Sequence, residues 1–133
     1  MTTHDQTPVR VLVVNDSEVL RQTMCQVVAA TPGFEVVGDA ASGREALALA
    51  GSLDAELVLL DAQMPEMDGI ETAILIRRQY PDVVVLLLTA TRRSHADDPT
   101  LTIEDKRDLS SQLLSEFWQR HNPRQSLPRQ NHQ

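Results

Sequence analysis

The stretch LVLLDAQMPEMDG, residues 57–69, decides the fold because it joins a buried strand to a polar loop. Four consecutive large aliphatic residues precede Asp61, and such an unbroken apolar run is typical of a parallel strand covered by helices on both faces. In doubly wound parallel sheets, ligands bind beyond the carboxyl ends of the strands. The stretch therefore predicts that Asp61 lies at a functional site.

Two further apolar runs end in the same way. Residues 11–14 lead into Asn15 and Asp16, and residues 83–88 lead into Thr89. An isolated aspartate after a strand is more often a turn residue or a helix cap. Three strands that each end in a short oxygen-bearing side chain favour a common site at one edge of a sheet.

Strand and helix patterns alternate along the chain, which predicts the right-handed crossovers of a doubly wound α/β sheet. Ser42 and Glu45 have the spacing of a capping box at a helix start, and Asp108 is the expected cap of the last helix. The expected strands are residues 11–14, 34–37, 57–60, 83–88 and 101–103. The expected helices are residues 19–28, 42–50, 69–79 and 109–121.

Several of these segments resemble the receiver domain of bacterial two-component response regulators. The resemblance rests on residues 11–16, 61–69 and 86–90. Residues 34–38 and 43–47 are most similar to the subfamily whose output is a helix-turn-helix transcription factor. The family implies a five-stranded parallel sheet in the order 2-1-3-4-5, the flavodoxin-like receiver fold, which places the first and third strands side by side.

The resemblance also implies a reaction, the transfer of a phosphoryl group from a sensor histidine kinase to Asp61 with Mg²⁺ as cofactor. Mg²⁺ prefers hard oxygen ligands and keeps several of its waters. Phosphoryl transfer depends mainly on positioning and charge stabilisation, so few side chains are needed. The metal ligands implied by the family pattern are Asp16, Asp61 and the backbone carbonyl of Gln63, with Asn15 acting through a water. The groups expected to bind the phosphoryl oxygens are Thr89 and Lys106.

The expected domain is a receiver over residues 9–121, preceded by a disordered segment, 1–8, and followed by a polar disordered tail, 122–133. Residues 90–100 are rich in Arg and Asp and lack the apolar stripe of a packed helix, so a shortened or irregular fourth helix is expected there. The sheet would then be partly uncovered, and the 90–118 face is expected to form a homodimer or to dock a partner. The apolar residues expected beside this segment are Leu101, Ile103, Phe117 and Trp118.

Composition limits the classes of partner. The chain has 19 acidic and 12 basic residues, and no acidic residue lies in 119–133, so its body is strongly acidic. This argues against direct nucleic-acid binding, because phosphate contacts need clustered Lys and Arg. No apolar run approaches the ~18 residues that a membrane span needs. The single cysteine, Cys25, suits a reducing cytoplasm, and Lys106 stands out as the only lysine.

Two departures from the family pattern leave an alternative open. Asn15 stands where the family usually has the first of two adjacent acids, and Ile103 stands where an aromatic residue is usual. The alternative is a receiver-like interaction module that works without phosphorylation. A related metal-dependent phosphatase would need an acid at Gln63, and no glycine-rich nucleotide-binding loop occurs. We therefore expect a signalling phosphoacceptor rather than an enzyme, catalysing at most its own phosphorylation and dephosphorylation. The resemblance to the helix-turn-helix subfamily implies a link to transcription regulation, although the sequence does not name the output.

Overall fold

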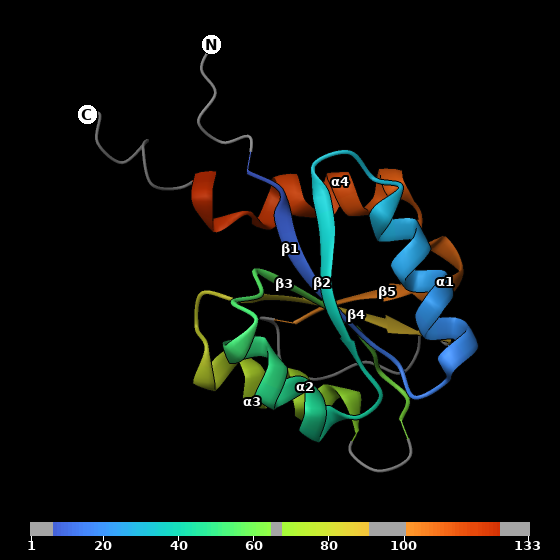
Figure 1. Ribbon diagram of the computed structural model, residues 1–133, viewed down its shortest axis with the longest axis vertical. Coiled ribbons are helices and arrows are strands. Elements are labelled where there is room, and N and C mark those ends of the chain that lie inside the picture. Colours follow the sequence, from blue (N-terminus) through green and yellow to red (C-terminus); the bar gives the residue numbers. More distant parts are fainter. Residues whose placement is uncertain (1–6, 65–67, 91–100, 126–133) are drawn as a thin grey trace.

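The structure, a computed structural model, describes residues 7–64, 68–90 and 101–125. A parallel five-stranded sheet runs through its centre in the order β2-β1-β3-β4-β5, which confirms the predicted α/β fold (Figure 1). The predicted irregular fourth helix covers residues 90–100, of which 91–100 lie outside the described residues. The strands are β1 (Val9–Val14), β2 (Phe34–Ala40), β3 (Leu57–Asp61), β4 (Val84–Thr89) and β5 (Thr102–Asp105).

Side chains of the central strands alternate between two faces of the sheet, and each face has its own hydrophobic core. In β3, Leu57 and Leu59 belong to one core, whereas Val58 and Leu60 belong to the other. All residues of β3 are buried, as expected for a strand between two helical layers. The helices on the Val58 face are α2 (Gly43–Ser52) and α3 (Gly69–Gln79), and those on the Leu57 face are α1 (Glu18–Ala29) and α4 (Ser111–His121) (Figure 1).

Helix starts follow capping chemistry. Ser42 Oγ accepts a hydrogen bond from Glu45 N at 3.1 Å, which confirms the Ser42 half of the predicted capping box. Glu45 Oε1 accepts its hydrogen bond from the N–H of Ala41, one residue before the N-cap residue that this motif uses. The prediction that Asp108 caps the last helix is wrong. Lys106–Asp108 forms a 3-10 turn, η2, and Ser110 caps α4 instead. None of the described helices is long and apolar enough to cross a membrane.

The expected apolar patch is not present in the form predicted, because its residues lie on opposite faces of the sheet. Phe117 and Trp118 are buried in the core beneath α4, where they are 2% and 7% exposed. Leu101 and Ile103 pack against the core on the other face. These four side chains therefore do not support the homodimer predicted for the 90–118 face.

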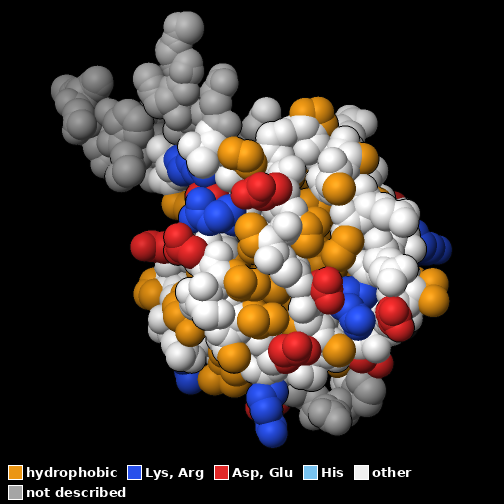
Figure 2. Space-filling view, viewed as in Figure 1, with side chains coloured by type: hydrophobic (Ala, Val, Ile, Leu, Met, Phe, Trp, Pro, Cys, Tyr) orange, Lys and Arg blue, Asp and Glu red, His pale blue; other side chains and the backbone are white. Residues whose placement is uncertain are grey.

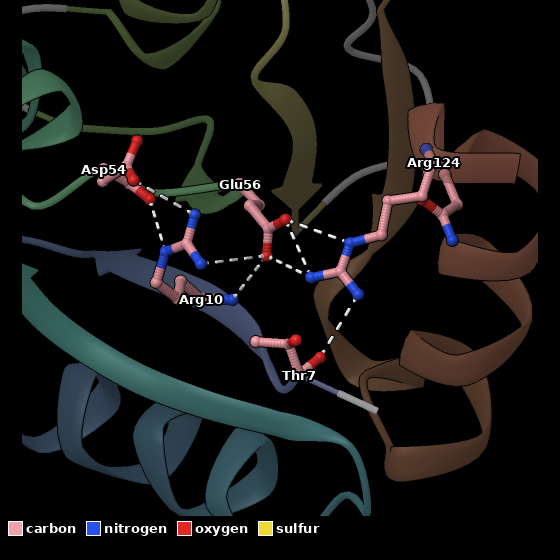
Figure 3. Close-up of polar contacts among 6 residues, drawn as sticks. Thr7, Arg10, Asp54, Glu56 and Arg124 are labelled. Atoms are coloured by element: carbon pink, nitrogen blue, oxygen red, sulfur yellow. Dashed lines mark hydrogen bonds and ion pairs between the residues drawn. The ribbon is translucent and has the colours of Figure 1, made fainter. Parts of the chain in front are cut away.

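A polar network at the edge of the sheet where β1 and β3 begin ties down the segment after α4 (Figure 3). Arg124 donates from Nε and Nη2 to the Glu56 carboxylate at 3.1 and 2.9 Å, and from Nη1 to the Thr7 carbonyl at 3.2 Å. Arg10 donates its backbone N–H to Glu56 at 3.1 Å and its Nε to the Asp54 carbonyl at 2.8 Å. The start of the predicted disordered tail is therefore folded against the domain.

Replacing Arg124 with glutamine is expected to lower the free energy of unfolding by about 1 kcal/mol, since a charge-assisted bidentate contact is lost. The Arg124 and Glu56 side chains are 22% and 21% exposed, so solvent screens this ion pair less than an open surface pair. Urea denaturation would measure the change. Arg120→Gln, on the exposed surface of α4, is the matched control and should unfold like the wild type. Equal unfolding free energies for the two variants would contradict the prediction.

Candidate functional site

Four parallel strands bring the predicted site residues to one edge of the sheet. Asp61 is the last residue of β3, and Thr89 is the last residue of β4. Asn15 follows directly after β1, and Lys106 follows directly after β5. The pairing register of β1 with β3 brings Asn15 level with Asp61. The sheet order therefore places Asn15 and Asp61 side by side at the ends of neighbouring strands.

Asp61 is a buried carboxylate paired with a lysine. It is 3% exposed, and its Oδ1 accepts a hydrogen bond from Gln63 N at 3.0 Å. The Nζ of Lys106 lies 3.4 Å from each of the two carboxylate oxygens. An ionised carboxylate can remain buried when a backbone donor and a cation stabilise it. The structure thus joins the acid at the end of β3 to the only lysine of the chain.

The two residues after β1 have opposite surroundings. Asn15 is 2% exposed, its Oδ1 accepts a hydrogen bond from Ser17 N at 2.9 Å, and its Nδ2 lies 3.4 Å from Met24 Sδ. Asp16, by contrast, is exposed. The amide of Asn15 is therefore bound within the protein, whereas the carboxylate of Asp16 is open to solvent beside the site.

Asp61 ends β3, and Asp16 lies just after β1, the neighbouring strand. Within the described ranges, no group of three or more His, Cys, Asp or Glu residues is arranged to hold a metal ion. Mg²⁺ is usually bound by one or two carboxylates and keeps several waters, so it does not need such a group. Asp16 and Asp61 supply carboxylates of the required type at the ends of adjacent strands.

Thr89 is fully buried at the end of β4, where it stands opposite Asp105 of β5. Its neighbour Ala90 donates a backbone N–H to Gln63 Oε1 at 3.4 Å. The side chain of Gln63 therefore connects the loop after β3 to the end of β4. The backbone N–H of the same residue binds Asp61, so Gln63 contacts two of the strand ends that form the site.

A cavity of about 130 Å³ lies beside Asp61, between α1 and the segment after β5. Its polar end is formed by Asn15, Asp61 and Lys106. Val19 and Leu20, in the first turn of α1, are 74% and 43% exposed. The first turn of α1 therefore leaves two apolar side chains exposed. The other lining residues are Leu20, Thr23, Met24, Val27, Leu88 and Leu109.

One buried acid at this edge was not identified from the sequence. Asp105 is 3% exposed, and its carboxylate accepts hydrogen bonds from the backbone and the side chain of Arg107. The sequence signal that could have drawn attention to Asp105 is its position immediately before Lys106. A short mixed-charge run usually forms a solvated surface, which is why the acid was overlooked.

Comparisons with known sequences agree with this arrangement. The sequence model of the response regulator receiver domain matches residues 11–107. A protein-glutamate methylesterase/protein-glutamine glutaminase of Myxococcus xanthus is 42% identical over 86 residues, which cover 65% of this chain and 24% of the relative. The response regulator protein VraR of Staphylococcus aureus is 39% identical over 82 residues, which cover 62% of this chain and 39% of VraR. The chain thus matches less than half the length of either relative.

Solved structures are similar over most of the chain. The response regulator domain of CheB from Thermotoga maritima is 27% identical with a TM-score of 0.65, covering 89% of this chain and 95% of that one. The chemotaxis protein CheY4 from Vibrio cholerae is 28% identical with a TM-score of 0.70, covering 86% of this chain and 98% of that one. Both similarities extend beyond the strand ends to the whole α/β architecture.

Proposed function

The chain belongs to the response regulator receiver domain family, whose members accept phosphoryl groups in two-component signalling, and we propose that Asp61 is its phosphoacceptor. The observation that carries this proposal is the buried Asp61 carboxylate with Lys106 Nζ at 3.4 Å from both oxygens. A carboxylate nucleophile needs a nearby cation that can stabilise the charge brought in by a phosphoryl group. Lys106 supplies that cation from the end of β5, which β4 separates from β3 in the sheet.

In the proposed reaction, a carboxylate oxygen of Asp61 attacks the phosphorus of a phosphohistidine on a sensor histidine kinase. The phosphorus–nitrogen bond breaks, its electron pair returns to the imidazole, and an acyl phosphate forms on Asp61. Lys106 pairs with one phosphoryl oxygen, and the hydroxyl of Thr89 donates a hydrogen bond to another. The compact ammonium of lysine on its flexible stem suits this role, because it can follow negative charge from the carboxylate to the phosphoryl group.

The residues present fit Mg²⁺, and we propose Asp16, Asp61 and the backbone carbonyl of Gln63 as its ligands. When bound, the ion would supply positive charge that offsets the repulsion between a carboxylate and an incoming phosphoryl group. Asn15 would act through a water. Because its amide carries no charge and is already bound to Ser17 N, we expect weaker magnesium binding than two adjacent acids would give.

A receiver-like module that works without phosphorylation is the second candidate, and the buried amide of Asn15 is the observation that favours it. Incubation of the protein with Mg²⁺ and acetyl phosphate, followed by intact mass measurement, distinguishes the two. The proposed function predicts a gain of one phosphoryl group that disappears when EDTA is added. No gain at any Mg²⁺ concentration would favour the phosphate-independent module.

We place the domain in the cytoplasm, where a histidine kinase would present its phosphorylated histidine. On the face seen in Figure 2, acidic and basic side chains are interspersed around apolar ones rather than gathered into a basic patch. Phosphate contacts need such a patch, so this face does not support binding of nucleic acid. Transcription regulation would be the task of a separate output module.

Replacing Asn15 with aspartate is expected to raise Mg²⁺ affinity several-fold, because a charge is added beside the metal ligands. The side chain is 2% exposed, so the new carboxylate should also destabilise the metal-free protein. Added Mg²⁺ should then restore more thermal stability to the variant than to the wild type. Calorimetric Mg²⁺ titration and thermal unfolding would measure both effects. Unchanged affinity would mean that Asn15 does not lie near the ion.

A further inference from the structure

The carboxylate of Asp105 has no role in the proposed reaction, although it is buried at the same edge of the sheet as Asp61. Asp105 is the last residue of β5, it is 3% exposed, and it pairs in register with Thr89. A buried carboxylate is costly unless it is hydrogen-bonded and paired with a cation. Its partners therefore indicate what the residue does.

Asp105 holds Arg107 at three points. Oδ1 accepts hydrogen bonds from the backbone N–H of Arg107 at 2.8 Å and from its Nε at 3.0 Å, and Oδ2 accepts one from Nη2 at 2.6 Å. A simple turn cap needs the backbone bond alone, so the two guanidinium bonds are additional. The hydrogen bonds that the Arg107 side chain donates to Asp105 raise the pKa of that side chain.

Asp105 and Arg107 are the residues immediately before and after Lys106, so their contact spans Lys106. β5 is the outermost strand on its side of the sheet and has four residues, and its pairing with β4 ends at Asp105. Beyond Asp105, strand pairing with β4 no longer fixes the backbone. Lys106 nevertheless places its Nζ 3.4 Å from both carboxylate oxygens of Asp61. Lysine has a flexible four-carbon stem, so a fixed backbone is needed to direct the ammonium.

We propose that Asp105 is a positioning residue for Lys106. By binding Arg107, Asp105 fixes the backbone conformation of Lys106, the residue between them. The fixed backbone directs the Lys106 ammonium toward Asp61. The pairing with Arg107 also neutralises Asp105, so that its carboxylate does not compete with Asp61 for Lys106. This inference rests on the proposed function, in which Lys106 stabilises the phosphoryl group on Asp61.

The test measures the rate of phosphoryl uptake from acetyl phosphate in four proteins: wild type, Asp105→Asn, Lys106→Ala and the double variant. Asparagine can still accept the backbone bond from Arg107 but loses the charge-assisted contact. Asp105→Asn should slow uptake about tenfold in the wild-type background. In the Lys106→Ala background the same change should have no further effect, because a residue that acts through Lys106 has nothing left to position.

Equal rate losses in both backgrounds, or no loss in either, would overturn the positioning role. If Lys106→Ala itself left uptake unchanged, the proposed function of Lys106 would fail instead, so the two failures are distinguishable. Arg107→Gln should reproduce the slower uptake, and it guards against a folding defect because its side chain is 80% exposed. Asp82→Asn makes the same charge change at an exposed position before β4, away from this turn, and should leave the rate at the wild-type value.

Discussion

The Asp61→Asn variant is expected to gain no phosphoryl mass on incubation with Mg²⁺ and acetyl phosphate. An amide oxygen is not a nucleophile toward phosphorus, and the substitution also removes the negative charge that Lys106 and Mg²⁺ would share. The change is nearly isosteric and converts a buried charge to a neutral group, so the fold should persist. Intact mass measurement and mapping of the phosphorylated peptide would check the result.

Asp54→Asn is the matched control for this experiment. The Asp54 side chain is 89% exposed and lies at the opposite edge of the sheet, in the network of Figure 3. Its φ of 56° is left-handed, a conformation that asparagine also tolerates, so this variant should fold and take up the phosphoryl group normally. If Asp61→Asn were labelled as well as Asp54→Asn, the phosphoacceptor would be a different residue.

The central fold was predictable because its signals are local and strong. The aliphatic run before Asp61 forms β3, with every residue buried, and the strand-end positions of Asp61 and Thr89 followed from the same pattern. The sheet order came from the family resemblance, since apolar patterns do not specify which strands pair. The contact between Asp61 and Lys106 depends on that order together with a turn after β5 that the sequence did not reveal.

The features that the sequence missed depend on tertiary contacts. Arg124 sits in a polar segment that looked disordered, but it meets Glu56, 68 positions earlier in the chain. Val19 and Leu20 have helical spacing, yet the described part of the structure leaves them exposed, because periodicity does not say whether another element covers the helix end. Ser110, rather than Asp108, caps α4, and both residue types are good caps, so residue type alone did not distinguish them.

The grouping of Leu101 and Ile103 with Phe117 and Trp118 was wrong for a geometric reason. All four are apolar and lie near one another in the sequence, but a strand between two helical layers sends alternate side chains to opposite faces. Ile103 faces the core under α2 and α3, whereas Trp118 enters the core under α4. Proximity in sequence therefore said nothing about which core each residue would join.

Replacing Gly69 with alanine is expected to lower the free energy of unfolding by about 3 kcal/mol, which would lower the melting temperature by roughly 10 °C. Gly69 is the buried first residue of α3 and donates its N–H to Ala62 O at 3.1 Å. A Cβ at this position would lie 2.5 Å from Ala62 Cα and would overlap the backbone carbonyl of Asp61. Backbone atoms cannot rotate away, so α3 and the end of β3 must separate.

This displacement should also slow phosphoryl uptake, because the carbonyl that is pushed belongs to the proposed phosphoacceptor. Gly38→Ala in β2 is the matched control, since its Cβ would meet the end of the Leu53 side chain, which can change rotamer. Thermal unfolding and acetyl phosphate labelling should be measured for both variants. The comparison distinguishes the effect of the overlap between the new Cβ and the backbone at position 69 from the general effect of replacing a glycine. If Gly69→Ala unfolded at the same temperature as Gly38→Ala and labelled at the wild-type rate, the close approach of α3 to Asp61 would not constrain the site.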